Sequence, residues 1–256
     1  MKQFAAFTKK EILEQLRTGR LLILIIIFCL FGIMNPAIAK MTPWMMEMMS
    51  EQLAESGMAI TTVDVDALTS WVQFFKNMPM ALIVFLILFS GIFTTEYQKG
   101  TLINVVTKGL KRWKIFVSKE SVMMIIWTLG CLTCYGITFG YNAYFWDNSV
   151  VHNVFFSAVC FYLFGLWLIS VLGLASVFCN SAGSVMLALG AAFGASYLLG
   201  LFPAVKEYVP SYLLQAPNLL TGNVDVGDYL WSVLILLALI VMQSIFSVVV
   251  FNKKNL

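Results

Sequence analysis

Six long stretches of apolar side chains run through this sequence, and they constrain its fold more than any other feature. Each reaches roughly the 20 residues that a helix needs to cross the hydrocarbon core of a bilayer. Because backbone N–H and C=O groups in lipid must be hydrogen-bonded within their own segment, we predict that these stretches are helical spans. We place the spans at residues 21–39, 78–95, 116–141, 154–178, 183–202 and 229–251.

Composition supports the same class of protein. The chain is 60% hydrophobic and 11% charged over 256 residues, which leaves too little polar surface to cover a soluble globule. We therefore predict an all-α polytopic membrane protein with one transmembrane domain, residues 1–256, and no affinity for nucleic acid.

The basic residues predict how the spans are oriented. Thirteen of the 16 lie before the first span, between the second and third spans, or after the sixth. Short loops rich in Lys and Arg remain in the cytoplasm. We therefore predict a cell (plasma) membrane protein with both termini and the loop 96–119 in the cytoplasm, and with the long loop 40–77 outside.

The first 39 residues allow more than one interpretation. A basic leader, an apolar run at 21–34 and Ala37-Ile38-Ala39 resemble a cleaved signal peptide. Alternatively the leader is retained, and residues 3–16 form either an amphipathic helix in the inner interface or a plain cytoplasmic tail. The interfacial helix is favoured by apolar residues that recur among charged ones. These residues are Phe4, Phe7, Ile12 and Leu16.

The loop 40–77 carries signals for two short helices that either rest on the outer leaflet or cap an exit. Thr42 is predicted as an N-cap, with Pro43 at the first helical position and Gly57 at the end. Residues 66–75 form the second predicted helix. A methionine cluster allows thioether binding of monovalent copper, but methionines at helical spacing more often pack or contact lipid, so we predict no metal site. The cluster comprises Met41, Met45, Met46, Met48, Met49 and Met58.

The predicted spans carry no residues for energy coupling or catalysis of their own. None has an acid or base near its middle, where proton-coupled carriers place them. The chain has no Walker A sequence and no HExxH motif, which would need two histidines. We interpret its one histidine, His152, as an interfacial residue and not as a member of a Ser/His/Asp set. Cys131 and Cys134 lie in an apolar helix, so we interpret them as packing residues rather than a redox pair. We expect no enzyme activity and no bound cofactor.

The loop 96–119 contains a short amphipathic helix, predicted at residues 102–107. Thr101 is placed to cap this helix and Gly109 to end it. Leu102, Val105 and Val106 fall on one side of it. We interpret that side as a surface for a cytoplasmic partner.

The fifth span is rich in small residues. Gly190 and Gly194 form a GxxxG motif, which lets a second helix approach closely. The motif predicts either packing within one subunit or an interface between two subunits.

The loop 96–119 also resembles a known family. Glu96, Gly100-Thr101 and Leu102, then the basic pair Lys111-Arg112, then Ser118-Lys119, resemble the pattern E-x-x-x-G-T-L, basic cluster, S-K. This pattern occurs between the second and third spans of type-2 ATP-binding cassette (ABC) transporter permeases. The six-span count, the interfacial N-terminal helix and the broken segment after the fifth span are similar as well.

The resemblance implies that this chain is a permease subunit paired with a second permease, identical or paralogous. Each permease would dock on a separate cytoplasmic ATPase that holds ATP and Mg, and the loop helix would act as the coupling helix. The implied coupling residues are Glu96, Gly100, Thr101, Leu102, Val105 and Val106. The basic anchors at the membrane surface are Lys108, Lys111, Arg112 and Lys119. We further expect Glu96 to pair with Arg17 or Arg20.

The expected function is therefore ATP-driven export of a peptide, drug or other amphipathic compound. Two alternatives remain open at this point. One is a self-sufficient secondary carrier or channel, and the other is a non-transporting scaffold for maturation of an exported metalloenzyme.

Overall fold

A computed structural model describes residues 2–54 and 65–254 of this protein, and these residues contain helices but no strand. Six of the helices are long and apolar enough to cross a membrane. This confirms the predicted all-α architecture with six spans. The six are α2 (Arg20–Ala54), α3 (Ala67–Phe89), α6 (Arg112–Phe145), α7 (Val154–Phe178), α8 (Ala182–Leu199) and α9 (Gly227–Lys253).

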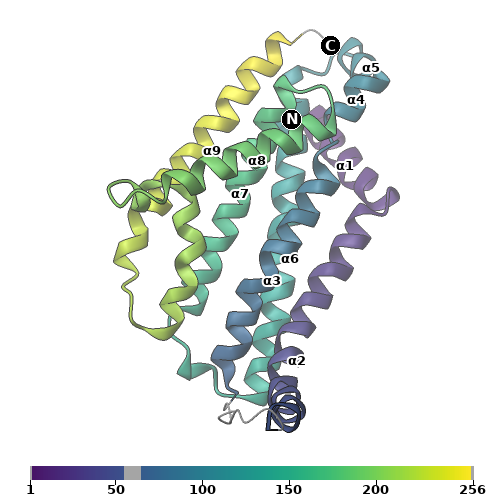
Figure 1. Cartoon of the computed structure of the whole chain (residues 1–256). Helices are drawn as coiled ribbons and strands as arrows, with labels where there is room; N and C mark the ends of the chain where they lie inside the picture. Colours follow the sequence, from purple (N-terminus) through teal and green to yellow (C-terminus); the bar gives the residue numbers. More distant parts are fainter. Residues whose placement is uncertain (1, 55–64, 255–256) are drawn as a thin grey trace.

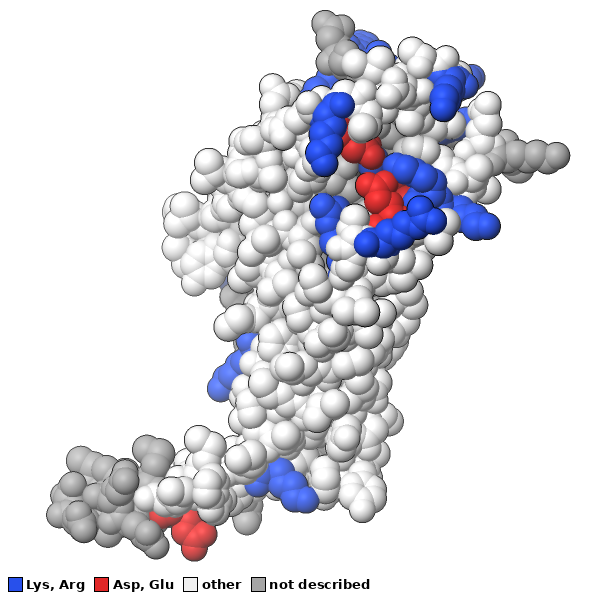
Figure 2. All heavy atoms as spheres, turned by 90° about the vertical axis from the view of Figure 1, so that its right-hand side faces the viewer, with Lys and Arg blue, Asp and Glu red and all other residues white. Residues whose placement is uncertain are grey.

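The remaining helices are short and lie at the ends of the spans or between them. They are α1 (Lys2–Arg17), α4 (Thr94–Lys99), α5 (Thr101–Thr107), η1 (Asn148–Val150), η2 (Lys206–Tyr208) and η3 (Pro210–Thr221). Figure 1 shows α1, α4, α5 and the end of α9 together at one end of the bundle. Lys, Arg, Asp and Glu side chains gather over this end in Figure 2, while the body of the bundle is almost free of charge. We call it the basic end, and the opposite one the far end.

Helix α6 packs against four of the other five spans, and glycines allow the closest approaches. A Cβ atom on Gly130 of α6 would overlap the ring of Phe28 on α2. A Cβ atom on Gly165 of α7 would overlap the ring of Trp127 on α6. Large aromatic rings therefore occupy the space that a side chain would need at either glycine.

Three polar side chains link α2, α3 and α6 in the half of the bundle toward the far end. The Asn77 amide donates to Asn35 Oδ1 at 2.8 Å, and the Asn35 amide donates to Thr138 Oγ1 at 3.2 Å. Asn35 and Thr138 are fully buried. Buried amides and hydroxyls are costly unless they are hydrogen-bonded, so these bonds favour one relative placement of the three helices.

The structure corrects the prediction for the loop 40–77. Helix α2 continues to Ala54 through Pro36 and Pro43. Thr42 is therefore not an N-cap, and its hydroxyl donates to the Ile38 carbonyl at 2.9 Å inside the helix. A proline removes one backbone hydrogen bond but does not by itself end a long helix that is stabilised on both sides. Gly57, the predicted end of the first short helix, lies outside the described residues.

The second short helix predicted in this loop is instead the beginning of span two. Asp66 caps α3 by accepting a hydrogen bond from Thr69 N at 3.0 Å. The helix then runs through Pro79 to Phe89 without a break. Its buried apolar positions, among them Trp71, Met78 and Phe85, recur in helical register across the predicted boundary, so the span begins at Ala67 rather than at residue 78.

The fifth span, α8, is followed by a broken segment as predicted, and this segment contains the long η3. Helix α8 ends at Leu199, and turns at residues 200–205 lead into η2 and η3. The Ser157 hydroxyl of α7 donates to the Ala216 carbonyl of η3 at 2.9 Å, and Tyr229 of α9 donates to the Gln215 carbonyl at the same distance. In Figure 1 α8 comes from the basic end and η3 continues toward the far end. Helices α8 and η3 thus together run from the basic end toward the far end, in place of one continuous helix.

The glycine contacts lead to a first prediction. Gly165→Ala should destabilise the protein by about 1–3 kcal/mol, because the new methyl group overlaps the Trp127 ring in a packed interior. At Gly136 of α6, a Cβ atom would meet no neighbouring atom within 4 Å. Gly136→Ala should therefore be neutral or stabilising by up to about 1 kcal/mol through helix propensity.

Thermal unfolding of the purified protein in detergent measures both variants. Equal melting temperatures for the two alanine variants would contradict this account of the α6–α7 contact.

Candidate functional site

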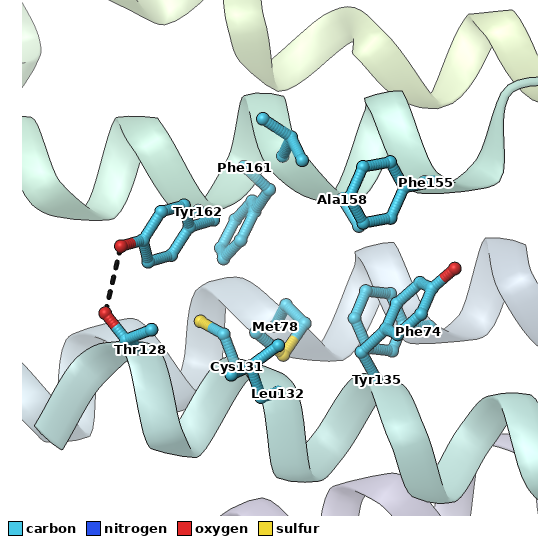
Figure 3. A pocket seen from close by; sticks show the side chains of 11 residues that line it. Phe74, Met78, Thr128, Cys131, Leu132, Tyr135, Phe155, Ala158, Phe161 and Tyr162 are labelled. Carbon is cyan, nitrogen blue, oxygen red and sulfur yellow. Dashed lines mark hydrogen bonds between the residues drawn. The ribbon is translucent and has the colours of Figure 1, made fainter. Parts of the chain in front are cut away.

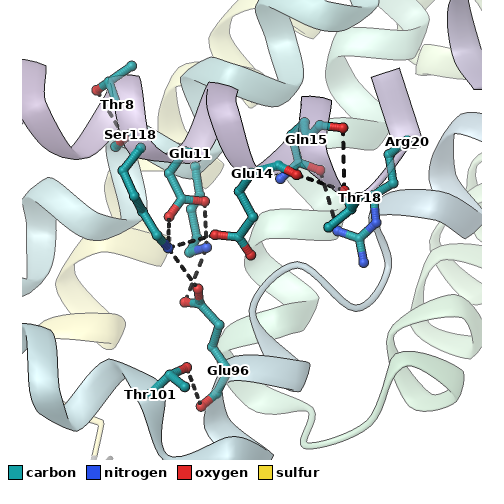
Figure 4. A network of polar contacts seen from close by, with 11 residues as sticks. Thr8, Glu11, Glu14, Gln15, Thr18, Arg20, Glu96, Thr101 and Ser118 are labelled. Atoms are coloured by element: carbon teal, nitrogen blue, oxygen red, sulfur yellow. Dashed lines mark hydrogen bonds and ion pairs between the residues drawn. The ribbon is translucent and has the colours of Figure 1, made fainter. Parts of the chain in front are cut away.

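A buried ion network lies at the basic end, where α1, α4 and α6 meet (Figure 4). Lys119 of α6 is 1% exposed. Its Nζ lies 2.7 Å from Glu11 Oε2 of α1 and forms an ion pair at 3.1 Å with Glu96 Oε2 of α4. Glu11 is fully buried. One lysine therefore joins two acids that are 85 positions apart in the sequence and belong to different helices.

A second lysine completes the network from its exposed side. Lys10 Nζ lies 2.9 Å from Glu11 Oε1, 2.7 Å from Glu14 Oε2 and 3.5 Å from Glu96 Oε1. Burial alone lowers the pKa of Lys10, but hydrogen bonds and charge from the acids outweigh it and raise that pKa above its usual range. Burial raises the pKa of Glu14, yet Lys10 brings it below its usual value. Both groups are therefore charged at neutral pH.

The three carboxylates of Glu11, Glu14 and Glu96 come within 4.8 Å of one another, a separation at which acids can share a metal ion. Here the Lys10 ammonium contacts all three. The lysines therefore supply the positive charge that the acids need at this position, and the cluster gives no reason to propose a metal.

Helix α1, predicted at residues 3–16, is confirmed, and its inward side is mainly polar. Phe7, Glu11 and Gln15 are buried at four-residue spacing. The Thr8 and Ser118 hydroxyls lie 2.9 Å apart across the contact with α6. Apolar Ile12, Leu13 and Leu16 are instead 38–51% exposed. This arrangement suits a helix that turns its outer side toward lipid. Cleavage after Ala39 would remove Glu11 and leave Lys119 with Glu96 alone.

The predicted partners of Glu96 are wrong. Glu96 pairs with Lys10 and Lys119, whereas the Arg20 guanidinium donates to Gln15 Oε1 at 3.4 Å. The order of residues in the sequence does not decide which base reaches Glu96. The rotation of α1 about its axis decides it, because that rotation turns residues 10 and 11 toward α6.

Two left-handed glycines fix the ends of α5. Gly100 has φ 64° and joins α4 to α5 as its N-cap. Thr101 is therefore the first residue of α5 and not its cap, and its hydroxyl donates to the Glu96 carbonyl at 3.5 Å. Gly109 has φ 85°, and its N–H donates to the Val106 carbonyl at 2.9 Å, so the predicted end of the helix is confirmed. Left-handed backbone favours glycine at both positions.

The apolar side of α5 faces the protein and is not a free surface. Leu102 is 2% exposed, and Val105 and Val106 pack partly buried against the core. Leu102 is therefore not available to a partner, because it attaches α5 to its own bundle. A partner contact at the half-buried Val105 and Val106 stays a prediction. The side that faces away exposes Ile103, which is 46% exposed, together with Asn104.

A hollow of about 250 Å³ lies beside α5 at the basic end. Lys254 borders it, with its Nζ 4.1 Å from the centre of the Tyr97 ring and 2.7 Å from the Val177 carbonyl. The hollow thus brings α4 and α5 next to the ends of α7 and α9. Its lining residues are Glu96, Tyr97, Gln98, Gly100, Leu102, Ile103, Asn180 and Lys254.

The four predicted basic anchors fall into two groups. Lys108 and Lys111 are exposed, as an anchor at a membrane surface requires. Arg112 is half-buried and donates to the Lys254 carbonyl, which ties the start of α6 to the end of α9. Lys119 is buried and paired. The anchor interpretation is therefore wrong for Lys119.

The GxxxG motif of α8 is open within the described part of the chain. A Cβ atom added to Gly190 or to Gly194 would meet no atom within 4 Å. These glycines therefore do not serve close packing inside one subunit. The alternative, an interface with a second subunit, stays a prediction.

An apolar pocket of about 230 Å³ lies between α3, α6 and α7 (Figure 3). Its one hydrogen bond between lining side chains joins Thr128 and Tyr162 at 2.9 Å. Cys131 lines the pocket, and both it and Cys134 are buried free thiols. We continue to interpret this cysteine pair as packing residues.

Sequence reasoning missed Lys10, Glu11 and Glu14 as members of the network. One signal was available for Glu11 and Gln15. They share a helical face with Phe7, so the side of α1 that appears apolar at Phe7 continues with polar residues that need partners.

Comparison with known proteins supports a membrane protein and no finer class. No family model matches the chain. It is 23% identical over 268 aligned positions to the uncharacterized transmembrane protein YxlG of Bacillus subtilis (strain 168), and the match covers 99% of this chain and 98% of that protein. We conclude that the chain is a multi-pass membrane protein.

The buried network leads to a second prediction. Lys119→Met should destabilise the protein by roughly 3 kcal/mol, because it leaves a buried carboxylate with only Lys10 for compensation. Lys111→Met changes an exposed side chain and should alter stability by less than about 1 kcal/mol.

Adding Glu11→Gln to Lys119→Met should recover part of the loss, because it removes the uncompensated buried charge. Melting temperatures in detergent measure all three variants, and a double variant no more stable than Lys119→Met would contradict the pairing.

Proposed function

We propose that this protein is the membrane-spanning permease subunit of an ATP-driven ABC transporter that exports a peptide, drug or other amphipathic compound. The observation that carries the proposal is the placement of α5. This short helix is held at the basic end by buried Leu102, and the Gly100 turn connects it to Glu96 and the ion network. The loop resemblance and the absence of a nucleotide motif support an energy source in a separate chain.

The proposed orientation places the basic end in the cytoplasm, because Lys and Arg concentrate there and such segments remain inside. An ATPase subunit would contact the outward side of α5, including Ile103, and the hollow beside it. Lys108 and Lys111 would lie near the anionic lipid surface.

The ion network gives this contact a route into the bundle. A movement of α5 reaches α4 through the single residue Gly100. Glu96 at the start of α4 pairs with Lys119 of α6 and Lys10 of α1. Because Lys119 cannot remain buried without its acids, α1, α4 and α6 would shift together. Glu96 thus acts as a positioning residue and not as a catalytic one.

A second permease subunit would pack against the open glycine face of α8, and the transported compound would pass between the two subunits. This chain binds no cofactor in the proposal, and ATP and Mg belong to the partner.

The outward side of α5 leads to a third prediction. An ATPase with a Walker A lysine, encoded beside this gene, should copurify with the tagged protein in detergent. Ile103→Glu should reduce the recovered ATPase at least about tenfold, because a buried, unpaired interface charge costs more than about 1.4 kcal/mol.

Val150→Glu provides the control, because Val150 is 57% exposed in η1 at the far end. It should leave copurification unchanged. Failure of any ATPase to copurify with the unchanged protein would contradict the proposed function, and solute movement by the purified protein alone in liposomes would favour a carrier or channel.

The role of Glu96 leads to a fourth prediction. Glu96→Gln keeps the shape of the side chain but removes its charge toward Lys119 and Lys10. We expect the ATPase to copurify normally, while cargo-stimulated ATP hydrolysis and transport fall at least about tenfold as a charge-assisted contact is lost. Unchanged stimulation and transport would show that Glu96 only stabilises the fold.

A further inference from the structure

Two charged residues of η2 lie on the side of the bundle and form no salt bridge with the described residues. Lys206 and Glu207 are both exposed, and neither has a salt-bridge partner among the described residues. They follow the turns after α8 and precede η3, in the break of the fifth span. The face of the bundle drawn in Figure 2, which is not the face that carries η2, has few charges between its ends.

Contacts with two neighbouring helices place η2 inside the depth of the spans. The Glu207 carbonyl accepts a hydrogen bond from Ser232, which lies five residues after the first residue of α9, roughly 7 Å along that helix. At the other end of η3, the Leu220 carbonyl accepts from His152 N next to the start of α7. Because a 3₁₀ helix rises about 2 Å per residue, the part of η3 from Pro210 to Leu220 is roughly 20 Å long.

Figure 1 agrees with these contacts, since the connection from α8 to η3 lies between the two ends of the bundle and beside α9. The hydrocarbon layer of a bilayer is roughly 30 Å thick. Lys206 and Glu207 therefore lie below the lipid headgroups of the far end.

Unpaired charges are strongly unfavourable in contact with lipid tails. A lysine can extend its amine toward the headgroups, but the glutamate side chain is too short to do so from this depth. The Ser232 hydroxyl is already used by the Glu207 carbonyl. No base in the described part of the chain pairs with the Glu207 carboxylate, and we infer that water solvates it.

We propose that η2 lines a water-filled vestibule that opens at the far end and receives the charged part of an amphipathic cargo. Lys206 and Glu207 offer one charge of each sign, and exposed Asp225 and Asp228 continue the polar surface toward the far end. Exposed Phe202 beside them, 61% exposed, offers apolar contact. The role for cargo rests on the proposed transport function, whereas the presence of water does not.

Cysteine accessibility tests the vestibule in membranes that contain the full-length chain with its native partners. The variants are K206C and E207C, each exposed to a charged, membrane-impermeant methanethiosulfonate reagent. V150C is the aqueous control, because Val150 is 57% exposed in η1 at the far end, and it also reports the side from which the reagent enters. L234C is the lipid control, because Leu234 is 58% exposed on α9, two residues from Ser232. The unchanged protein gives the background from its five free cysteines.

We expect K206C and E207C to react from the same side as V150C and at least about tenfold faster than L234C, since the charged reagent does not enter lipid. Reaction of both no faster than L234C would overturn the vestibule. If one variant is not produced at the normal level, the other decides. If the η2 cysteines react but no ATPase copurifies, the vestibule is supported and the proposed function is contradicted. If an ATPase copurifies but the η2 cysteines do not react, the proposed function is supported and the vestibule is contradicted.

Discussion

The burial of Lys119 is the constraint on which the arrangement at the basic end depends. A lysine that is 1% exposed requires carboxylates, and here they come from α1 and α4. The requirement therefore fixes how the N-terminal helix rotates and where the chain turns after span two. An apolar residue at position 119 would not impose either choice, because apolar contacts are not directional.

The same requirement links the short helix α5 to the spans. Helix α5 is attached to the bundle by Leu102 and continues through the left-handed Gly100 into α4, which carries Glu96. A force on α5 therefore acts on a paired, buried group and not on a flexible loop. The far half of the bundle has its own directional contacts, the Asn77–Asn35–Thr138 hydrogen bonds. Between these two layers the helices pack closely through glycines and aromatic rings.

Much of the fold was predictable from the sequence, and the errors have a common origin. The fourth span was placed at its observed limits, residues 154–178, because polar residues interrupt the apolar run on both sides. Spans one and two were placed too short, since amphipathic helix continues past the apolar run to Ala54 and begins before it at Ala67. At the candidate site, Glu96 and Gly100 were recognised through the family resemblance, and Gly109 was recognised from a local helix-end signal. The burial of Leu102 and the partners of Glu96 were not, because they depend on the face that each helix turns toward its neighbours.

The sequence by itself determined that this chain crosses a membrane six times as helices, because the length of an apolar run and the need to satisfy backbone hydrogen bonds in lipid are local properties. It also determined which end is basic. Only the tertiary structure decided which of those charges are buried, which acids Lys119 joins, and that the fifth span breaks to leave Lys206 and Glu207 beside α9. These features depend on helix rotation and on contacts between residues far apart in the chain, which hydrophobic periodicity does not specify.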